Sequence, residues 1–498
     1  MISDIHIEIT PIEEAVDAIL EATVTFFLQD TPEEFIHPLL ETNIAKIVDE
    51  LNENIYCFIE YPYVDKVYRD SYYNYYASKH YTYQRDCIRV SLFDCEIKQN
   101  DFLDEKNHQK LRDNYLGYFV IRPTINALIG RSIIDPKAFI DNGVNICNCK
   151  TSTLVYGVKL DVEGFPYSSQ DGESIKCAET TIWAIMEYFG TKYPDYKPAL
   201  PGVIHITLKS VSVQRQLPSN GLTMDQISFA LREFGFGTRI YSFDPYDEQI
   251  YSIVDSYVES GIPVIIGLES KNLGHVVICI GKKNEDRIDY RRVKKRNLRI
   301  NGSELNYYST SDIPSLYVIQ DDNLIPYRLI DLMKPGEHYD DDESKAYTID
   351  SVVVPLYPKI YLESVVAKSL ALEILKDTTV GYQMPTGFVF RFYLTSSRSF
   401  KRHIGELEYL DKDIKNSILI TKMPKFIWIS EFYNKTEYKK QIKKALALIV
   451  LDATEANRES IDALIFAGYP DRCVCVNENN FVTLHHRFEN YRYYSNLK

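Results

Sequence analysis

The chain has 498 residues, of which 45% are hydrophobic and 25% are charged, and its formal net charge is −14. This composition is typical of a globular protein, and the length predicts two to four domains at roughly 100–200 residues each. A surface this acidic argues against nucleic acid as a partner, because binding phosphates requires Lys and Arg.

Neither the N-terminus nor any apolar run indicates a membrane protein. The first residues lack the basic stretch and the apolar stretch of a signal peptide. The longest apolar runs, such as Ala445 to Leu451, are far shorter than the roughly 20 residues that span a bilayer. The nine cysteines are scattered and odd in number, whereas disulfide frameworks are typical of small secreted domains. We therefore expect a cytoplasmic protein with no membrane partner.

The sequence shows no pattern for a metal or a cofactor. Two Cys-x-Cys pairs, Cys147 with Cys149 and Cys473 with Cys475, have no histidine that would complete the roughly four ligands of a zinc site. No glycine-rich loop that would cradle a phosphate is found either. We expect neither a bound metal nor a cofactor.

The first region, residues 1–162, combines helix-like and strand-like patterns. Helices are predicted for Pro11 to Leu28 and for Thr31 to Leu51, where a threonine, a proline and two acids mark a helix start. Aromatic and β-branched residues predict strands at Cys87 to Phe93 and at Gly117 to Ile121. This pattern predicts an N-terminal α/β domain.

Two further regions follow, at 163–358 and 359–498. The middle region alternates helical and strand patterns and contains the candidate catalytic residues. The last region starts with a helix-like stretch, Leu362 to Leu375, and a short amphipathic helix is predicted at Arg458 to Phe466. Its strand-like runs are Gly387 to Leu394, Phe426 to Ile429 and Leu446 to Leu451. We expect a C-terminal α+β domain.

Cys177 stands at the start of a predicted helix in the middle region. The apolar residues of that helix recur with helical spacing, at Ile182, Ile185, Met186 and Phe189, and Gly190 is placed to end it. A helix N-terminus favours an anion, so a thiol there has a lowered pKa and is a candidate nucleophile. Gln170, upstream, is a candidate donor to a developing oxyanion. The alternative is that Cys177 is a small buried residue.

Histidine and aspartate candidates follow after two more helices. The first helix starts at a capping box, Thr223 with Gln226, and the second runs from about Asp247 to Glu259. Strand-like runs then occur at Pro263 to Leu268, Gly274 to Gly281 and Ser315 to Gln320.

His275 begins the second of these strands, which we expect to be central in its sheet, and the third leads into Asp321 and Asp322. A carboxylate at that place is suited to hold an imidazole in one tautomer. The alternatives are a buried structural histidine and an ordinary turn after a strand.

The order of these parts resembles papain-like cysteine peptidases, most closely their C39-like branch, over residues of about 163–330. The resemblance rests on a cysteine that opens a helix, on the motifs Leu217-Pro218, Gly221-Leu222-Thr223 and Gly261-Ile262-Pro263-Val264, on Gly274 to Gly281, and on a strand ending in Asp. It implies an α+β papain-like hydrolase domain at 163–358 between the two flanking domains.

The resemblance also implies the site residues: Cys177 as nucleophile, His275 as general base, Asp321 as the residue that orients the histidine, and Gln170 in the oxyanion hole. Asp322 stays open as the orienting residue instead. The sequence departs from the family pattern in three places: Gln170 lies seven residues before the cysteine rather than six, Ala178 replaces the usual glycine, and the gap between His275 and Asp321 is long.

The implied function is a cysteine peptidase or related thiol hydrolase that cleaves a peptide or amide bond through an acyl-enzyme. The alternatives are an acyltransferase with the same triad and a catalytically inactive interaction module. The expected partner is a peptide or protein substrate, and the flanking domains are candidates for protein binding. A basic insertion, Lys282 to Pro314, separates His275 from Asp321 and is expected to form a solvated hairpin.

Overall fold

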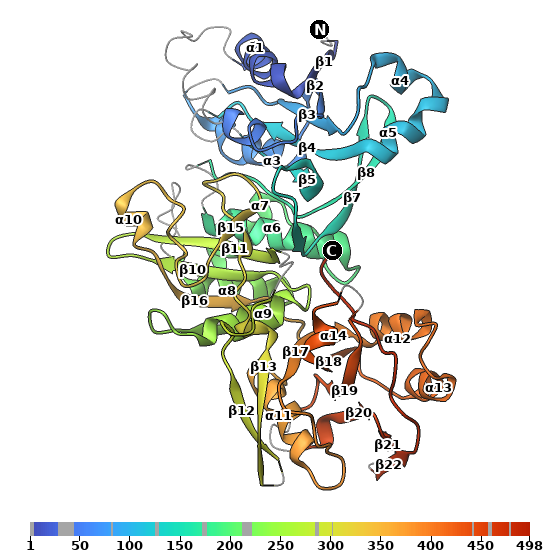
Figure 1. Cartoon of the computed structure of the whole chain (residues 1–498). Helices are drawn as coiled ribbons and strands as arrows, with labels where there is room; N and C mark the ends of the chain where they lie inside the picture. The colour runs from blue at the N-terminus through green and yellow to red at the C-terminus, as the bar shows by residue number, and fades with distance from the viewer. Residues whose placement is uncertain are drawn as a thin grey trace.

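The structure is a computed structural model in which helix and strand contribute about equally, 32% and 31%. It describes residues 4–27, 44–80, 83–124, 129–171, 177–211, 222–283, 288–300, 302–440, 443–456, 461–477 and 480–498. Three lobes follow one another from the N-terminus, at one end of the molecule, to a last sheet at the other end (Figure 1). The mixed content agrees with the α+β class expected from the sequence. No helix within the described ranges is long and apolar enough to cross a membrane.

The N-terminal lobe is built on a five-stranded sheet whose strands neighbour one another in chain order. The strands are β1 (His6–Pro11), β2 (Tyr56–Tyr63), β3 (Cys87–Phe93), β4 (Tyr115–Ile121) and β5 (Ile133–Ile134). The helices are α1 (Ala15–Phe27), α3 (Lys66–Asn74), α4 (Gln99–Leu103) and α5 (His108–Asn114).

All neighbouring strands of this sheet are antiparallel, so this lobe is α+β and the α/β assignment was wrong. The alternation of helix and strand along a chain does not reveal whether a helix crosses over the sheet or lies beside a hairpin. The expected strand at Cys87–Phe93 is confirmed, and the helix expected from Thr31 lies mainly outside the described residues.

The central lobe is built on a seven-stranded sheet with β11 in its middle. The strands are β6 (Val144–Ile146), β9 (Arg239–Ser242), β10 (Val264–Glu269), β11 (Gly274–Lys283), β14 (Tyr317–Gln320), β15 (Arg328–Ile330) and β16 (Thr348–Val354). The helices are α6 (Cys177–Lys192), α7 (Pro201–Val211), α8 (Met224–Glu233), α9 (Gln249–Val258) and α10 (Asp342–Lys345). A separate hairpin of β7 (Cys149–Val155) and β8 (Val158–Gly164) connects this lobe to the N-terminal lobe.

The C-terminal lobe contains an eight-stranded sheet. Its strands are β12 (Arg296–Ile300), β13 (Ser303–Ser309), β17 (Phe388–Ser396), β18 (Phe426–Tyr433), β19 (Ala445–Asp452), β20 (Leu464–Gly468), β21 (Cys473–Asn477) and β22 (Asn480–Leu484). The helices are α11 (Ser364–Lys376), α12 (Ser397–Glu406), α13 (Lys412–Ile420) and α14 (Lys435–Tyr438). The amphipathic helix expected at Arg458 to Phe466 was wrong for its apolar end, because a short 3-10 helix at Ile461–Ala463 is followed by β20, which pairs with β19. Residues 458–460 lie outside the described ranges. A short apolar run fits a buried strand as well as a helix.

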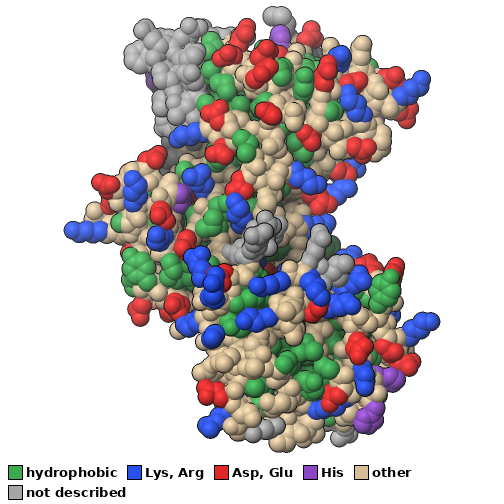
Figure 2. Space-filling view, in the orientation of Figure 1, with side chains coloured by type: hydrophobic (Ala, Val, Ile, Leu, Met, Phe, Trp, Pro, Cys, Tyr) green, Lys and Arg blue, Asp and Glu red, His purple; other side chains and the backbone are tan. Residues whose placement is uncertain are grey.

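The basic insertion forms a hairpin, as expected, but the expectation that it is solvated was wrong, because Leu298, Ile300 and Tyr307 belong to the apolar core. The hairpin also enlarges the C-terminal sheet. Its strands β12 and β13 pair with each other, and β13 pairs in parallel with β17. The ring of Tyr290, just before the hairpin, lies 4.7 Å from Nζ of Lys435 in α14. Figure 2 shows Lys and Arg side chains gathered on this face of the molecule, around α14.

Strand pairing and packing join the three lobes, although the sequence pattern separates the ranges 1–162, 163–358 and 359–498. Strand β6 pairs with β11, and the backbone of Lys498 returns to form two hydrogen bonds with Ile146. One continuous apolar core contains both Trp183 of the central lobe and Trp428 of the C-terminal lobe. Between these lobes, the fully buried Arg391 bonds to two buried carboxylates, those of Glu259 and Glu431.

Candidate active site

Helix α6 places Cys177 at its first residue. All residues from Ala178 to Phe189 are buried, not only the apolar face that the sequence predicts. The outer face is covered by the N-terminal lobe, whose Arg131 bonds to the Glu187 carboxylate at 2.9 Å. The helix continues two residues beyond Gly190, so the prediction that this glycine ends it was wrong. A Cβ there would lie 2.2 Å from the Pro198 nitrogen, so Gly190 serves close packing.

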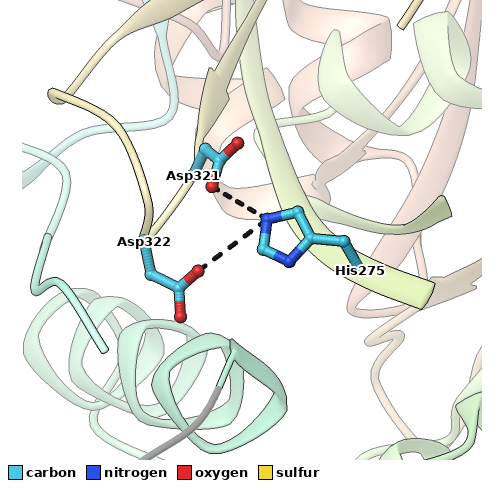
Figure 3. A group of neighbouring side chains, drawn as sticks. All are labelled: His275, Asp321 and Asp322. Carbon is cyan, nitrogen blue, oxygen red and sulfur yellow. Dashed lines mark hydrogen bonds and ion pairs between the residues drawn. The ribbon is translucent and has the colours of Figure 1, made fainter. Parts of the chain in front are cut away.

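His275 lies on β11, between the neighbouring strands β10 and β14. Its ring is 6% exposed. Nε2 lies 2.8 Å from Oδ1 of Asp321. Figure 3 shows the other ring nitrogen pointing away from the carboxylates of Asp321 and Asp322. The Cys177 thiol, which is partly exposed, lies near enough to the His275 ring to raise the pKa of that ring. Because Nε2 faces Asp321, Nδ1 is the nitrogen left for the thiol.

Asp321 is fully buried directly after the end of β14. Besides facing His275, it accepts hydrogen bonds from the backbone N–H of Asn323, at 3.0 Å, and from the Tyr339 hydroxyl. Burial alone would raise the pKa of Asp321, but the His275 charge and these hydrogen bonds hold it below the ordinary value. Asp321 is therefore held as a carboxylate.

The same contacts act on the histidine. Burial alone would lower the pKa of His275, but the Asp321 carboxylate, the Cys177 thiol and the charge of Asp322 hold it well above the ordinary value. These surroundings therefore favour the protonated form of the imidazole. A protonated ring beside a sulfur stabilises the thiolate form of the thiol.

Asp322 was the alternative to Asp321, and the structure places it differently. Its Oδ1 lies 3.8 Å from Nε2 of His275, beyond hydrogen-bonding distance. Burial, with the neighbouring Asp321 charge adding to it, raises the pKa of Asp322 to about 7 although His275 lowers it. The geometry therefore favours Asp321 as the residue that orients the ring.

Gln170 lies beside this turn, and the side-chain hydrogen bond that it donates within the described ranges goes to Asn323 rather than to Cys177. Its side-chain amide donates to Oδ1 of Asn323, and its backbone N–H donates to the carbonyl of Asp322 at 3.3 Å. Asn323 is exposed, and its own amide nitrogen lies 3.4 Å from Nε2 of His275. Because the hydrogen bond to Asn323 uses one amide proton within the described part of the chain, the second amide proton of Gln170 can bond a substrate oxygen.

The N-terminal lobe fixes the segment that carries Gln170. Nη2 of the buried Arg122 donates to the carbonyl of Ser169 at 2.9 Å. The backbone N–H of Ser169 donates to the carbonyl of Ile129 at 2.9 Å, and Ser132 pairs with Tyr167. The backbone leading to the candidate oxyanion donor is thus held by the neighbouring lobe.

Sequence reasoning missed two residues of the site, Asn323 and Tyr339. Asn323 directly follows the two candidate acids, so its position was a usable signal. Tyr339 lies in the loop between β15 and β16 and reaches Asp321 only through the fold. No local pattern marks it.

The ring nitrogen of His275 and the carboxylates of Asp321 and Asp322 are also the one buried set of potential metal ligands within the described ranges, with atoms within 4.8 Å of one another. Zinc binds nitrogen and carboxylate ligands at about 2.0–2.2 Å. An ion here would displace the 2.8 Å hydrogen bond between His275 and Asp321. The satisfied oxygens of Asp321 fit a hydrogen-bond network better than a metal centre.

Comparison with models of known protein families finds no match to this chain, and comparison with curated protein sequences finds none either.

Proposed function

We propose that the protein is a thiol hydrolase, similar to the C39-like branch of the papain-like cysteine peptidases, that cleaves a peptide or amide bond through an acyl-enzyme. One observation carries the proposal: the thiol of Cys177, at the first residue of α6, lies near enough to His275 to raise the pKa of its ring, whose Nε2 faces the buried carboxylate of Asp321 at 2.8 Å. Nucleophile, base and orienting residue in this order are the parts that covalent catalysis needs.

In the proposed reaction, the thiolate of Cys177 attacks the carbonyl carbon and forms a tetrahedral intermediate. His275 then gives its proton to the leaving nitrogen as the C–N bond breaks, which leaves an acyl-enzyme. The neutral imidazole next takes a proton from water, whose oxygen attacks the thioester, and Cys177 leaves as the thiolate. Asp321 keeps the ring in one orientation and stabilises its charged form.

Two kinds of donor are available for the negative oxygen of the intermediate. The backbone N–H groups at the start of α6 have no partner within the helix and lie at the positive end of its dipole. The side-chain amide of Gln170 is the second donor. Such donors typically contribute about 2.7–4 kcal/mol each to a transition state of this type.

Alkylation of the thiols by iodoacetamide at pH 6, resolved by peptide mass spectrometry, tests the proposal. We expect Cys177 to react first, because an ordinary thiol with a pKa near ~8.5 is almost fully protonated at that pH. Cys95 and Cys475 are matched controls, since both are partly exposed thiols and no histidine among the described residues contributes to the shift of their pKa values. His275→Ala should slow Cys177 to the control rate, and equal rates in the wild-type protein would contradict the proposal.

A second experiment separates the proposed hydrolase from its alternatives. A library of peptide esters would be offered to the protein, and the acyl group on Cys177 would be detected as added mass. Release of that group to water supports a hydrolase, whereas preferential release to added amines supports an acyltransferase. A reactive thiol that no ester acylates would favour the interaction module.

A further inference from the structure

The turn after β14 brings two consecutive carboxylates to the same ring nitrogen. Successive residues of an extended strand point to opposite faces, but Asp321 and Asp322 both approach Nε2 of His275, at 2.8 and 3.8 Å (Figure 3). The turn is closed by the N–H of Leu324, which donates to the carbonyl of Asp321 at 3.1 Å, and is tied to Gln170. Its backbone therefore holds both acids beside the ring.

Asp322 is buried between the histidine and the helix that carries the thiol. Its side chain is 5% exposed, and Thr180 in the first turn of α6 is near enough to stabilise its ionised form. The other titratable groups that face it are His275 from β11, the adjacent Asp321, Tyr167 before α6 and Tyr339 from the loop after β15. Of these, only His275 carries a positive charge.

We propose that Asp322 is a second positioning carboxylate, which acts through His275 and sets the pH range over which the ring keeps its proton beside Cys177. The inference rests on the proposed function, because it assigns a role within the same thiol and imidazole pair. Asp321 orients the ring through a hydrogen bond. Asp322 lies too far for that bond and acts through its charge.

The direction of the effect follows from the charges. Below about pH 7, Asp322 is largely neutral, since burial raises the pKa of this carboxyl to about 7. Above it, the ionised carboxylate adds a negative charge beside Nε2, and the ring holds its proton to higher pH. An opposite charge within about 4–6 Å typically shifts a pKa by about 1–3 units. Without Asp322, His275 should therefore lose its proton at a lower pH, so the protonated ring beside Cys177 should persist over a narrower pH range.

The ratio of the alkylation rates of Cys177 by iodoacetate and by iodoacetamide reports the charge on His275. A protonated ring attracts the anionic reagent and not the neutral one, and the ratio cancels the intrinsic reactivity of the sulfur. We expect this ratio for Cys177 in the wild-type protein to exceed the ratio for Cys475, a partly exposed thiol whose pKa no neighbouring charge in the described ranges shifts, and to fall at alkaline pH, where His275 loses its proton.

In Asp322→Asn, which keeps the size of the side chain, we expect the ratio of the two alkylation rates of Cys177 to fall at a pH about 1–3 units lower than in the wild-type protein. Thr180→Val retains the carboxylate and should shift the fall in the same direction by less. Asp340→Asn, which removes an exposed carboxylate, is the matched control and should leave the profile unchanged.

The outcomes separate this inference from the function on which it rests. If the wild-type ratio for Cys177 equals the ratio for Cys475 at every pH, His275 carries no charge beside the thiol, and both proposals fail. If the wild-type ratio is high but its fall in Asp322→Asn coincides with the wild type within ~0.3 unit, the role of Asp322 is refuted while the hydrolase proposal stands.

Discussion

Replacing Asp321 by Asn should lower the opening free energy of strands β11 and β14, and the size of this loss should depend on pH. The change removes one charge and keeps the size of a side chain that is fully buried. Breaking a buried ion pair costs about 3–5 kcal/mol. We expect this loss near pH 6, where the unfolded histidine is also protonated and the pair contributes fully.

The loss should shrink as the pH rises. The pKa of His275 is raised in the folded protein, so the pair stabilises the fold fully below the unfolded pKa of about 6.5 and loses that contribution as the pH rises toward the folded pKa. Each pH unit removes about 1.4 kcal/mol, so the difference between wild type and variant should be about 2 kcal/mol smaller at pH 8 than at pH 6. Below about pH 4 it should also decline, because the folded pKa of Asp321 is lowered and this carboxylate becomes protonated only in acid.

Amide hydrogen exchange of peptides from β11 and β14 measures the effect locally. The opening free energy of these strands is accessible without assuming that three joined lobes unfold in one step. Asp340→Asn serves as the control. A difference that is constant between pH 6 and 8, or that grows with pH, would refute the assignment of Asp321 and His275 as a charged pair.

Three further changes test other contacts. Tyr339→Phe removes a hydrogen bond to the Asp321 carboxylate; hydrogen bonds to charged groups are worth about 1.5–3 kcal/mol, so we expect a higher pKa of that carboxyl and slower alkylation of the site thiol by iodoacetamide. Gly190→Ala should destabilise α6 by about 1–3 kcal/mol through overpacking against Pro198, although alanine favours helices, and exchange in α6 measures the sign. Arg391→Met leaves the buried Glu431 without its cation, whereas Glu259 keeps Lys282, and should cost about 3–5 kcal/mol, seen as an earlier thermal transition; Glu431→Gln in the same chain should restore much of it.

Features that depend on neighbours along the chain could be predicted. The capping box is present as expected, with Thr223 and Gln226 bonded to each other in both directions at the start of α8. Strand β3 has the predicted bounds. Each of these patterns is complete within a few residues, so local sequence is sufficient to specify it.

Features that depend on distant contacts could not be predicted. Leu464 to Phe466 is a strand because β19 and β21 lie on either side of it, and its own pattern suits a helix equally. The N-terminal sheet is antiparallel because its helices do not cross over it to join parallel strands, and the order of helices and strands along the chain does not reveal this. Gly190 lies inside a helix because another segment, at Pro198, comes too close for a side chain.

The candidate site divides in the same way. The sequence by itself determined that Cys177 opens a helix, that His275 begins a strand and that two acids end another, because these positions follow from hydrophobic periodicity. Only the tertiary structure decided that Asp321 rather than Asp322 bonds the ring, and that Tyr339 supports it. A difference of 2.8 against 3.8 Å is set by the turn and by packing from several distant segments, and no local pattern in the chain encodes separations that fine.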